Sequence, residues 1–340
     1  MQKGKVISIL LALSLVVAMV CNVLMYISVK DMTEKEKNVE VIPAGAEALK
    51  ETKGEETTTK PEDEKVVDVV SKDTIKSYFG EKGEGVLKML RDIYTEDVVY
   101  YDGKYKFEPI NKDLALNTLD LNGFEKDKYG HYIYKEKGKK VGHKGIDVSK
   151  YQGDIDWEKV KGDGIEFAII RVGYRGYGSG QLVMDESAID NLKGAKRAGI
   201  DIGVYFFTQA IDKKEAEEEA DYVIDIIKDY DIKYPIVIDT EPISGDEARS
   251  DALSAEERTE VVAAFCERVK AKNYKPMIYA NIKWFLTALD MTKLEAYDKW
   301  FAYYDDELYF PYKIAMWQYS GTGKVSGING DVDLNVYFGE

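Results

Sequence analysis

Eight short apolar runs, separated by longer polar or amphipathic stretches, constrain the fold of this chain more than any other feature. They lie at residues 145–148, 167–172, 202–207, 236–238, 277–279, 300–303, 314–317 and 332–337. Alternation of strands and helices over about 200 residues favours a parallel sheet, and eight strands suffice to close a barrel. We therefore expect an α/β fold, an irregular TIM-like (β/α) barrel. It is irregular because the segments between the later runs are too short for full helices.

Three of the stretches between these runs carry helix signals. Residues 212–230 place alanine, valine and isoleucine on one face. Ser254, with Glu257 three residues later, forms a capping box that starts a second helix. Gly199 marks the end of a third. These signals support the alternation on which the predicted barrel rests.

The fourth apolar run ends in two carboxylates. Asp239 and Glu241 follow residues 236–238, whose β-branched side chains favour a buried strand. Residues i and i+2 of an extended chain point to the same side, so both acids share one face of the strand end. Like charges this close raise one pKa, and carboxyl pairs with separated pKa values suit hydrolysis of a glycosidic bond. A solvated strand end, or a cap for the next segment, is the alternative interpretation.

Barrel closure predicts that two further acids join this pair. The first and eighth strands become neighbours, and active sites in such barrels lie at the C-terminal ends of the strands. Asp147 lies near the end of the first run and Asp333 lies in the eighth. Four carboxylates are thus expected around one cleft. Taken alone, Asp147 also fits a cap for the following loop, and Asp333 also fits a helix or turn acid.

Composition excludes several classes of protein. The chain has 62 acidic and 47 basic residues and a net charge of −15, which argues against nucleic-acid binding. His131 and His143 are too few nitrogen ligands for a typical catalytic zinc site, and neither adjoins a nucleophile-elbow pattern. Cys21 lies in an apolar run and Cys266 on an apolar helix face, so we expect no disulfide between them.

The residues before the barrel fall into four parts. Residues 6–29 are almost wholly apolar and exceed the about 20 residues that span a bilayer, so we interpret them as a single-pass transmembrane signal anchor. Residues 1–5 form a short cytoplasmic tail. Residues 30–72, rich in Glu, Lys and Thr, are a disordered, flexible linker. Residues 73–142 are a small accessory α+β region with a hairpin at Asp102-Gly103, and residues 143–340 form the barrel domain.

Several of these segments resemble one enzyme family. Residues 145–157, which begin Gly145-Ile146-Asp147-Val148, are similar to the opening motif of glycoside hydrolase family 25, the lysozymes of the bacterial and phage type. Other segments resemble that family's strands in the same order, namely residues 167–173, 203–207, 238–241, 316–320 and 332–335. The resemblance covers about residues 143–338 and does not extend to the N-terminal parts.

The resemblance implies an N-acetylmuramidase that cleaves the β-1,4 bond between N-acetylmuramic acid and N-acetylglucosamine in peptidoglycan, without metal or cofactor. Carried onto matching positions, Glu241 would be the general acid. Asp239 would orient the 2-acetamido group of the substrate or stabilise positive charge at the anomeric carbon. Asp147 and Asp333 would complete the acidic cleft. This activity places the catalytic domain outside the cell, attached to the cell membrane, with glycan strands as its partner.

Side chains near the strand ends are candidates for binding sugar, because large flat rings stack on the apolar faces of saccharides. The candidates are Tyr174, Tyr205, Trp317, Gln318 and Tyr319. Tyr279 is favoured instead as a core residue. Strand alternation puts Gln318 on the opposite face from Trp317 and Tyr319, so these three cannot all face one cleft without a bulge.

We therefore expect a membrane-anchored peptidoglycan hydrolase, with two alternatives open. The first is a catalytically silent peptidoglycan-binding or scaffold module, tethered near secretion or other cell-wall machinery. The second is a chitinase-like glycosidase, which also uses an Asp-x-Glu strand end and an acetamido group. Binding of peptidoglycan without turnover would favour the first alternative, and activity on chitin would favour the second.

Overall fold

The structure, a computed structural model, describes residues 71–79 and 85–339. All of these residues belong to one compact unit, Val69–Glu340. The predicted cytoplasmic tail, transmembrane anchor and linker, up to residue 70, lie outside the described residues. Among the helices that are described, none combines the length and apolar character needed to cross a bilayer.

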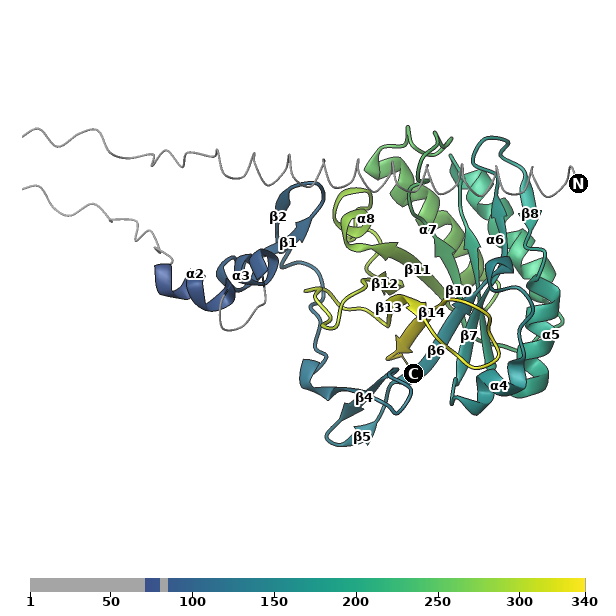
Figure 1. The fold of residues 1–340 in the computed structure, drawn as a ribbon. Coiled ribbons are helices and arrows are strands. Elements are labelled where there is room, and N and C mark those ends of the chain that lie inside the picture. The colour runs from purple at the N-terminus through teal and green to yellow at the C-terminus, as the bar shows by residue number, and fades with distance from the viewer. Residues whose placement is uncertain (1–70, 80–84, 340) are drawn as a thin grey trace, which may run out of the picture. The chain divides into compact units, whose positions relative to one another are not determined.

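A closed ring of eight strands forms the centre of the described unit (Figure 1). The strands are β6 (His143–Val148), β7 (Phe167–Arg175), β9 (Asp201–Phe207), β10 (Ile232–Asp239), β11 (Pro276–Asn281), β12 (Asp298–Ala302), β13 (Met316–Gly323) and β14 (Val332–Tyr337). β6 pairs with β7 on one side and with β14 on the other, which closes the ring. A short strand, β8 (Leu182–Met184), extends β7 outside it. The predicted α/β barrel is therefore confirmed.

The direction of β14 departs from the expected parallel sheet. It runs antiparallel to both of its neighbours, β13 and β6, whereas the other pairs within the ring are parallel. A parallel return needs a crossover of about a dozen or more residues, and only residues 324–331 join β13 to β14. The chain therefore turns back as a hairpin, and the start of β14 lies beside the end of β6.

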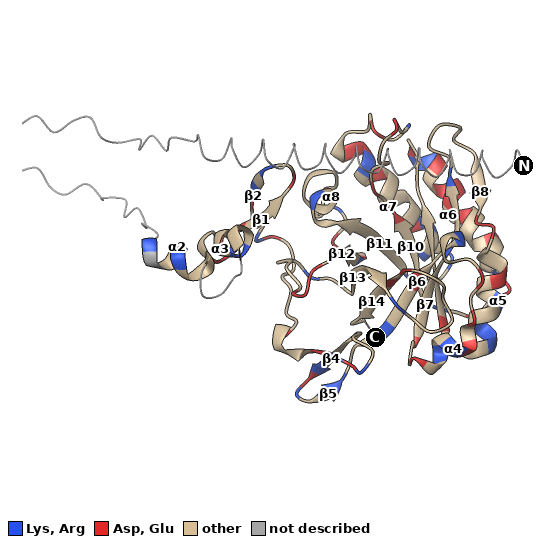
Figure 2. Ribbon diagram, in the orientation of Figure 1, with Lys and Arg blue, Asp and Glu red and all other residues tan. Residues whose placement is uncertain are grey.

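Helices on the outside of the ring connect the earlier strands. They are α4 (Trp157–Gly162), α5 (Ala188–Ala198), α6 (Lys213–Ile227), α7 (Ala255–Ala271) and α8 (Ile282–Thr287), with a short 3-10 helix η2 (Lys150–Gln152). The predicted capping box is present, because Ser254 Oγ accepts from the Glu257 N–H and a Glu257 carboxylate oxygen accepts from the Ser254 N–H. Gly199 ends α5 with a φ of 69°. Figure 2 shows the charged residues concentrated on the helices and loops, with few on the strands.

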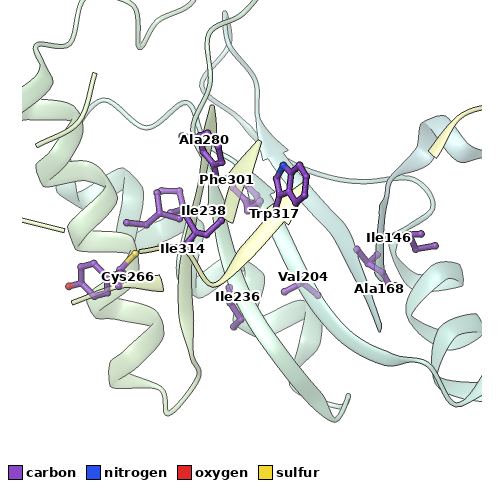
Figure 3. Close-up of a cluster of buried hydrophobic side chains, with 14 of the residues drawn as sticks. Ile146, Ala168, Val204, Ile236, Ile238, Cys266, Ala280, Phe301, Ile314 and Trp317 are labelled. Carbon is purple, nitrogen blue, oxygen red and sulfur yellow. The ribbon is translucent and has the colours of Figure 1, made fainter. Parts of the chain in front are cut away.

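Alternating side chains along the strands build two separate apolar cores. One cluster comes from positions such as Phe167, Ile169, Val237 and Met316, which face the inside of the barrel. The other faces outward and packs against the helices; Figure 3 labels Ile146, Ala168, Val204, Ile236, Ile238, Cys266, Ala280, Phe301, Ile314 and Trp317 from it. Burying an aliphatic or aromatic side chain stabilises the fold by about 1.5–3 kcal/mol, so both cores support the ring.

Residues before β6 form small elements, several of which pack on the barrel. They are α2 (Lys72–Phe79), α3 (Gly85–Ile93), β1 (Asp97–Tyr101), β2 (Tyr105–Pro109), η1 (Leu121–Gly123), β3 (Phe124–Lys126), β4 (Tyr132–Glu136) and β5 (Lys139–Lys140). The predicted hairpin is confirmed, with Gly103 in the turn at a φ of 67°. Tyr309 of the barrel accepts a hydrogen bond from the Val99 N–H at 2.9 Å. Strands β3, β4 and β5 form a second small sheet, which we call the accessory sheet.

Candidate active site

The structure brings the four predicted acids together around one pocket of about 180 Å³. Asp239 is the last residue of β10, and Glu241 follows it on the same side. Thr240 between them points elsewhere, since its Oγ1 accepts a hydrogen bond from Trp284 Nε1 at 3.2 Å. Asp147 lines the pocket from the end of β6.

Asp333 reaches the same pocket because β14 is antiparallel. It lies near the start of β14 and is paired in register with Asp147 of β6. In a parallel eighth strand, a residue at this position would lie at the opposite end of the barrel. The reversal of β14 therefore places the fourth acid at the C-terminal ends of the parallel strands.

A network of amide groups holds Asp147 in place. Gln318 Nε2 and Asn335 Nδ2 both donate to Asp147 Oδ2, each at 2.8 Å. The amide oxygen of Gln318 accepts from the Tyr279 and Tyr304 hydroxyls at 2.8 and 2.9 Å. Trp300 Nε1 donates to Asn335 Oδ1 at 2.8 Å. Every amide atom is thus used with its proper polarity, which fixes the orientation of the carboxylate.

Burial and mutual repulsion favour the protonated forms of the four acids. Burial, followed by the nearby Asp333, raises the pKa of Glu241 to about 7. Burial raises the pKa of Asp333 to about 6. The pKa values of Asp147 and Asp239 are also raised by burial, and then by the acids beside each of them. Groups this close titrate as a set, so the pocket retains a proton near neutral pH.

Asp239 has an unused hydrogen-bonding position. Its Oδ1 atom is buried and has no hydrogen-bond partner among the described residues. The charge of Arg171 acts on Asp239 in the opposite sense to the other acids and lowers its pKa, although burial prevails. Arg171 is itself fixed by Asp185, whose Oδ2 accepts from Arg171 Nε at 2.7 Å. A buried acceptor without a partner is costly, so this oxygen is suited to a ligand donor.

The predicted sugar-binding residues divide into two groups. Tyr205 and Gln318 line the pocket. Trp317 and Tyr319 do not line this pocket, because strand alternation turns them to the outer face of β13. There the Trp317 ring stacks on Tyr132 of the accessory sheet at a centroid distance of 5.4 Å. The register of β13 shifts after Gln318, but the shift does not bring either aromatic inside.

Tyr174 is also absent from the residues that line the pocket. β7 has an irregular register between Arg171 and Gly173, and Arg171 takes the last regular inward position before it. Tyr174 lies beyond this irregularity, with its ring centroid 5.8 Å from the Arg171 guanidinium carbon. Tyr174 therefore lies outside this pocket, and sugar binding by Tyr174 stays a prediction.

Three aromatic residues of the pocket were missed by the sequence reasoning. Tyr279, which was favoured as core, pairs in register with Asp239 and sends its hydroxyl into the pocket. Its position at a strand end was a usable signal. Trp300 and Tyr304 also line the pocket, but Tyr304 lies in the loop after β12, where no periodic pattern marks it. Among the described residues, no cluster of His, Cys, Asp and Glu has the arrangement to hold a metal ion.

A closed α/β barrel with an acid-lined pocket at the strand ends defines the class of barrel glycoside hydrolases. Residues 146–328 match the model for Glycosyl hydrolases family 25. This match spans more than half of the chain, and the chain belongs to that family. The resemblance found in the sequence is thereby confirmed, and the protein is a glycoside hydrolase of the lysozyme type.

Individual relatives agree with this assignment. Lysozyme M1 of Streptomyces globisporus is 30% identical over 209 residues, which cover 58% of this chain and 68% of that protein. The modular autolysin LytC of Streptococcus pneumoniae, solved with a synthetic peptidoglycan ligand, has a TM-score of 0.52 at 25% identity. That match covers 69% of this chain and 54% of LytC, so the chain spans about half of the autolysin. A bacterial lysozyme from Streptomyces coelicolor has a TM-score of 0.50 at 28% identity. That match covers 58% of this chain and 93% of the lysozyme chain.

Proposed function

We propose that this protein cleaves the β-1,4 bond between N-acetylmuramic acid and N-acetylglucosamine in peptidoglycan. The observation that carries the proposal is the pocket in which Asp147, Asp239, Glu241 and Asp333 meet within a family 25 barrel. The relatives support the substrate, since one is a lysozyme and another was solved with a peptidoglycan ligand.

Glu241 acts as the general acid. Its pKa of about 7 leaves the carboxyl about half protonated at neutral pH and largely protonated below it. The proton passes to the glycosidic oxygen as the bond from that oxygen to the anomeric carbon breaks. Asp333 supports this role, because its negative charge beside Glu241 opposes loss of that proton.

Asp239 orients the substrate. The unpartnered Oδ1 atom accepts a hydrogen bond from the N–H of the 2-acetamido group. The acetamido oxygen is then placed to attack the anomeric carbon, which is the substrate-assisted route open to N-acetyl sugars. Asp147, held by Gln318 and Asn335, stabilises in its ionised form the positive charge that develops on the sugar.

Digestion of purified peptidoglycan tests the proposal. The full-length chain should release fragments with reducing N-acetylmuramic acid ends, identified by borohydride reduction and mass spectrometry. Glu241→Gln should lower the rate by about 10²–10⁴-fold, the usual contribution of a general acid, while the far-ultraviolet circular dichroism spectrum stays unchanged. Reducing N-acetylglucosamine ends, or undiminished release by the variant, would contradict the assignment.

The same assay separates the two alternative functions. A silent binding module would retain peptidoglycan in a pull-down without releasing fragments. A chitinase-like enzyme would release fragments from chitin faster than from peptidoglycan. We expect the reverse order of substrates.

The location at the cell membrane is a further part of the proposal. It rests on the apolar run at residues 6–29, which lies outside the described residues. Membrane fractionation of cells that express the full chain, with a protease added outside, tests it. The barrel should sediment with membranes and be digested, whereas a soluble or protected barrel would overturn the placement.

A further inference from the structure

We propose that a groove beside the catalytic pocket is a second glycan-binding site, which holds sugar units that flank the cleaved bond. The groove runs between the accessory sheet and the β13–β14 turn and has a volume of about 780 Å³. We call it the accessory groove. Its walls include Lys126, Tyr129 and Tyr132 on one side and Tyr304, Tyr319 and Thr322 on the other. The inference rests on the proposed function.

The accessory groove adjoins the catalytic pocket. Tyr304 lines both, with its hydroxyl bonded to Gln318 in the pocket and its side chain 60% exposed. Gly321 of the groove lies against the same two residues that edge the pocket. A Cβ atom there would stand 3.2 Å from Asp333 Oδ1 and 3.5 Å from the Tyr304 ring. The groove therefore lies next to the four acids, where neighbouring units of a bound polymer would be placed.

The volumes of the catalytic pocket and the accessory groove indicate that each holds a different part of the substrate. Small-molecule sites in proteins occupy about 300–1,000 Å³, and the catalytic pocket of about 180 Å³ is below this range. It has room for the reacting part of the substrate only. The groove of about 780 Å³ lies well within the range, so it supplies space for the next part of the chain.

The chemistry of the groove favours a neutral sugar chain over a charged peptide. Lys126 is paired with Asp306 at 2.7 Å, and Lys324 is paired with Asp331 at 2.7 Å. Asp305 accepts the Tyr303 hydroxyl at 2.9 Å. The two ion pairs lower the net charge along the groove, and tyrosine rings, hydroxyls and backbone groups also line it and can contact a ligand. Such surfaces suit the apolar faces and hydroxyls of saccharides.

One wall of the groove is a feature of this chain beyond the part that matches the family. Lys126, Tyr129 and Tyr132 all precede residue 146, where the family match begins. Tyr132 fixes this wall to the barrel, because its hydroxyl donates to the Asp306 carbonyl at 2.6 Å and its ring stacks on Trp317. The wall is thus preformed, which lowers the entropic cost of binding a flexible strand.

Filling the groove gives the main test. Thr322→Trp inserts a large side chain at an exposed position in the groove, outside the catalytic pocket. Thr118→Trp is the matched control, at an exposed threonine that lines neither the groove nor the pocket. Both variants of the full-length chain are assayed on peptide-free oligomers of the alternating disaccharide and, for comparison, on strands that carry their peptides. The set of oligomers runs from the shortest that the unmodified protein cleaves to strands several disaccharides longer.

We expect Thr322→Trp to lower kcat/KM on the long strands by about 3–10-fold and to leave the shortest substrate within twofold. Thr118→Trp should match the unmodified protein on both. Tyr129→Ala, which removes a ring that is 43% exposed, should weaken long-strand cleavage in the same direction without blocking the groove.

Any of the following outcomes would overturn the inference. Equal effects of Thr322→Trp on short and long substrates, or none on either, would show that the groove holds no sugar. An effect seen only with strands that carry peptides would assign the groove to the peptide. Failure of the unmodified protein to cleave any strand would refute the proposed function and the groove with it, whereas normal cleavage without length dependence would refute the groove alone.

Discussion

Trp317 and Gln318 are neighbours on β13, yet their side chains lie in two regions of opposite character. Gln318 points into the barrel, where it bonds to Asp147 and two tyrosine hydroxyls beside the other acids. Trp317 points outward and is fully buried between barrel and accessory sheet, against Phe124 and Tyr132. One strand thus serves the polar pocket with one face and an aromatic core with the other.

The difference shows that one region of the fold can offset the energetic cost of another. Crowding two buried and two half-buried carboxyls raises their pKa values and makes their ionised forms costly at neutral pH. The aromatic core on the outer face carries no charge and contributes dispersion and hydrophobic burial. We expect substitution of an acid in the pocket and of an aromatic residue on the outer face to act in opposite ways on stability and on activity.

The largest effect on stability is expected in the aromatic core. Trp317→Ala removes the ring packed against Phe124 and Tyr132 and should lower the free energy of unfolding by about 3–5 kcal/mol. Urea denaturation followed by circular dichroism measures this loss. Activity per folded molecule should change much less than stability. If Trp317→Ala is as stable as the unmodified protein, the outer face is not the stabilising region described here.

An opposite effect is expected at Glu241. A carboxyl with a pKa of about 7 when folded and about 4.5 when unfolded stabilises the fold below pH 4.5, and this contribution is lost as pH rises towards 7. Glu241→Gln does not ionise, so at pH 8 it should be more stable than the unmodified protein by about 2–3 kcal/mol.

Denaturation at pH 4 and pH 8 measures this difference. The gain from Glu241→Gln should disappear at the lower pH, where the carboxyl is protonated in both the folded and the unfolded state. A variant that is destabilised at pH 8 would show that the Glu241 charge is well accommodated in the pocket.

A smaller loss is expected at Gln318, whose substitution tests the polar face directly. Gln318→Ala removes a donor to Asp147 and leaves the buried Tyr279 hydroxyl without its acceptor, which should cost about 1–3 kcal/mol. In contrast to Trp317→Ala, it should also lower kcat/KM, since Asp147 is no longer fixed. Paired assays of unfolding and peptidoglycan cleavage compare the two neighbours. Unchanged activity would mean that the network serves stability alone.

The smallest effect concerns the pH dependence of activity. Because Glu241 must be protonated, kcat/KM should fall about tenfold per pH unit, about 1.4 kcal/mol, above a pH of about 7. Asp333→Asn removes a charge that raises the Glu241 pKa, so this alkaline limb should move to lower pH. Initial rates on soluble glycan strands between pH 5 and 9 measure it. A limb that stays in place would exclude electrostatic coupling between these two acids.

The sequence was informative wherever a local pattern carries the signal. The eight apolar runs predicted the strands, and Ser254 with Glu257 predicted the start of α7. The spacing of Asp239 and Glu241 predicted that both would face one side, because a strand alternates its side chains whatever surrounds it. The same alternation placed Gln318 on the opposite face of the strand from Trp317 and Tyr319. It did not predict which of the two faces would line the pocket.

Tertiary structure alone decided the direction of β14, the outward position of Trp317 and the entry of Tyr279 and Tyr304 into the site. These depend on how a closed ring aligns strands that are distant along the chain, and no local propensity encodes that alignment. The accessory sheet adds a second example, since only packing of Tyr132 on Trp317 turns residues 126–132 into one wall of a groove. The sequence by itself determined which residues can do the chemistry, and the closure of the barrel determined which of them meet.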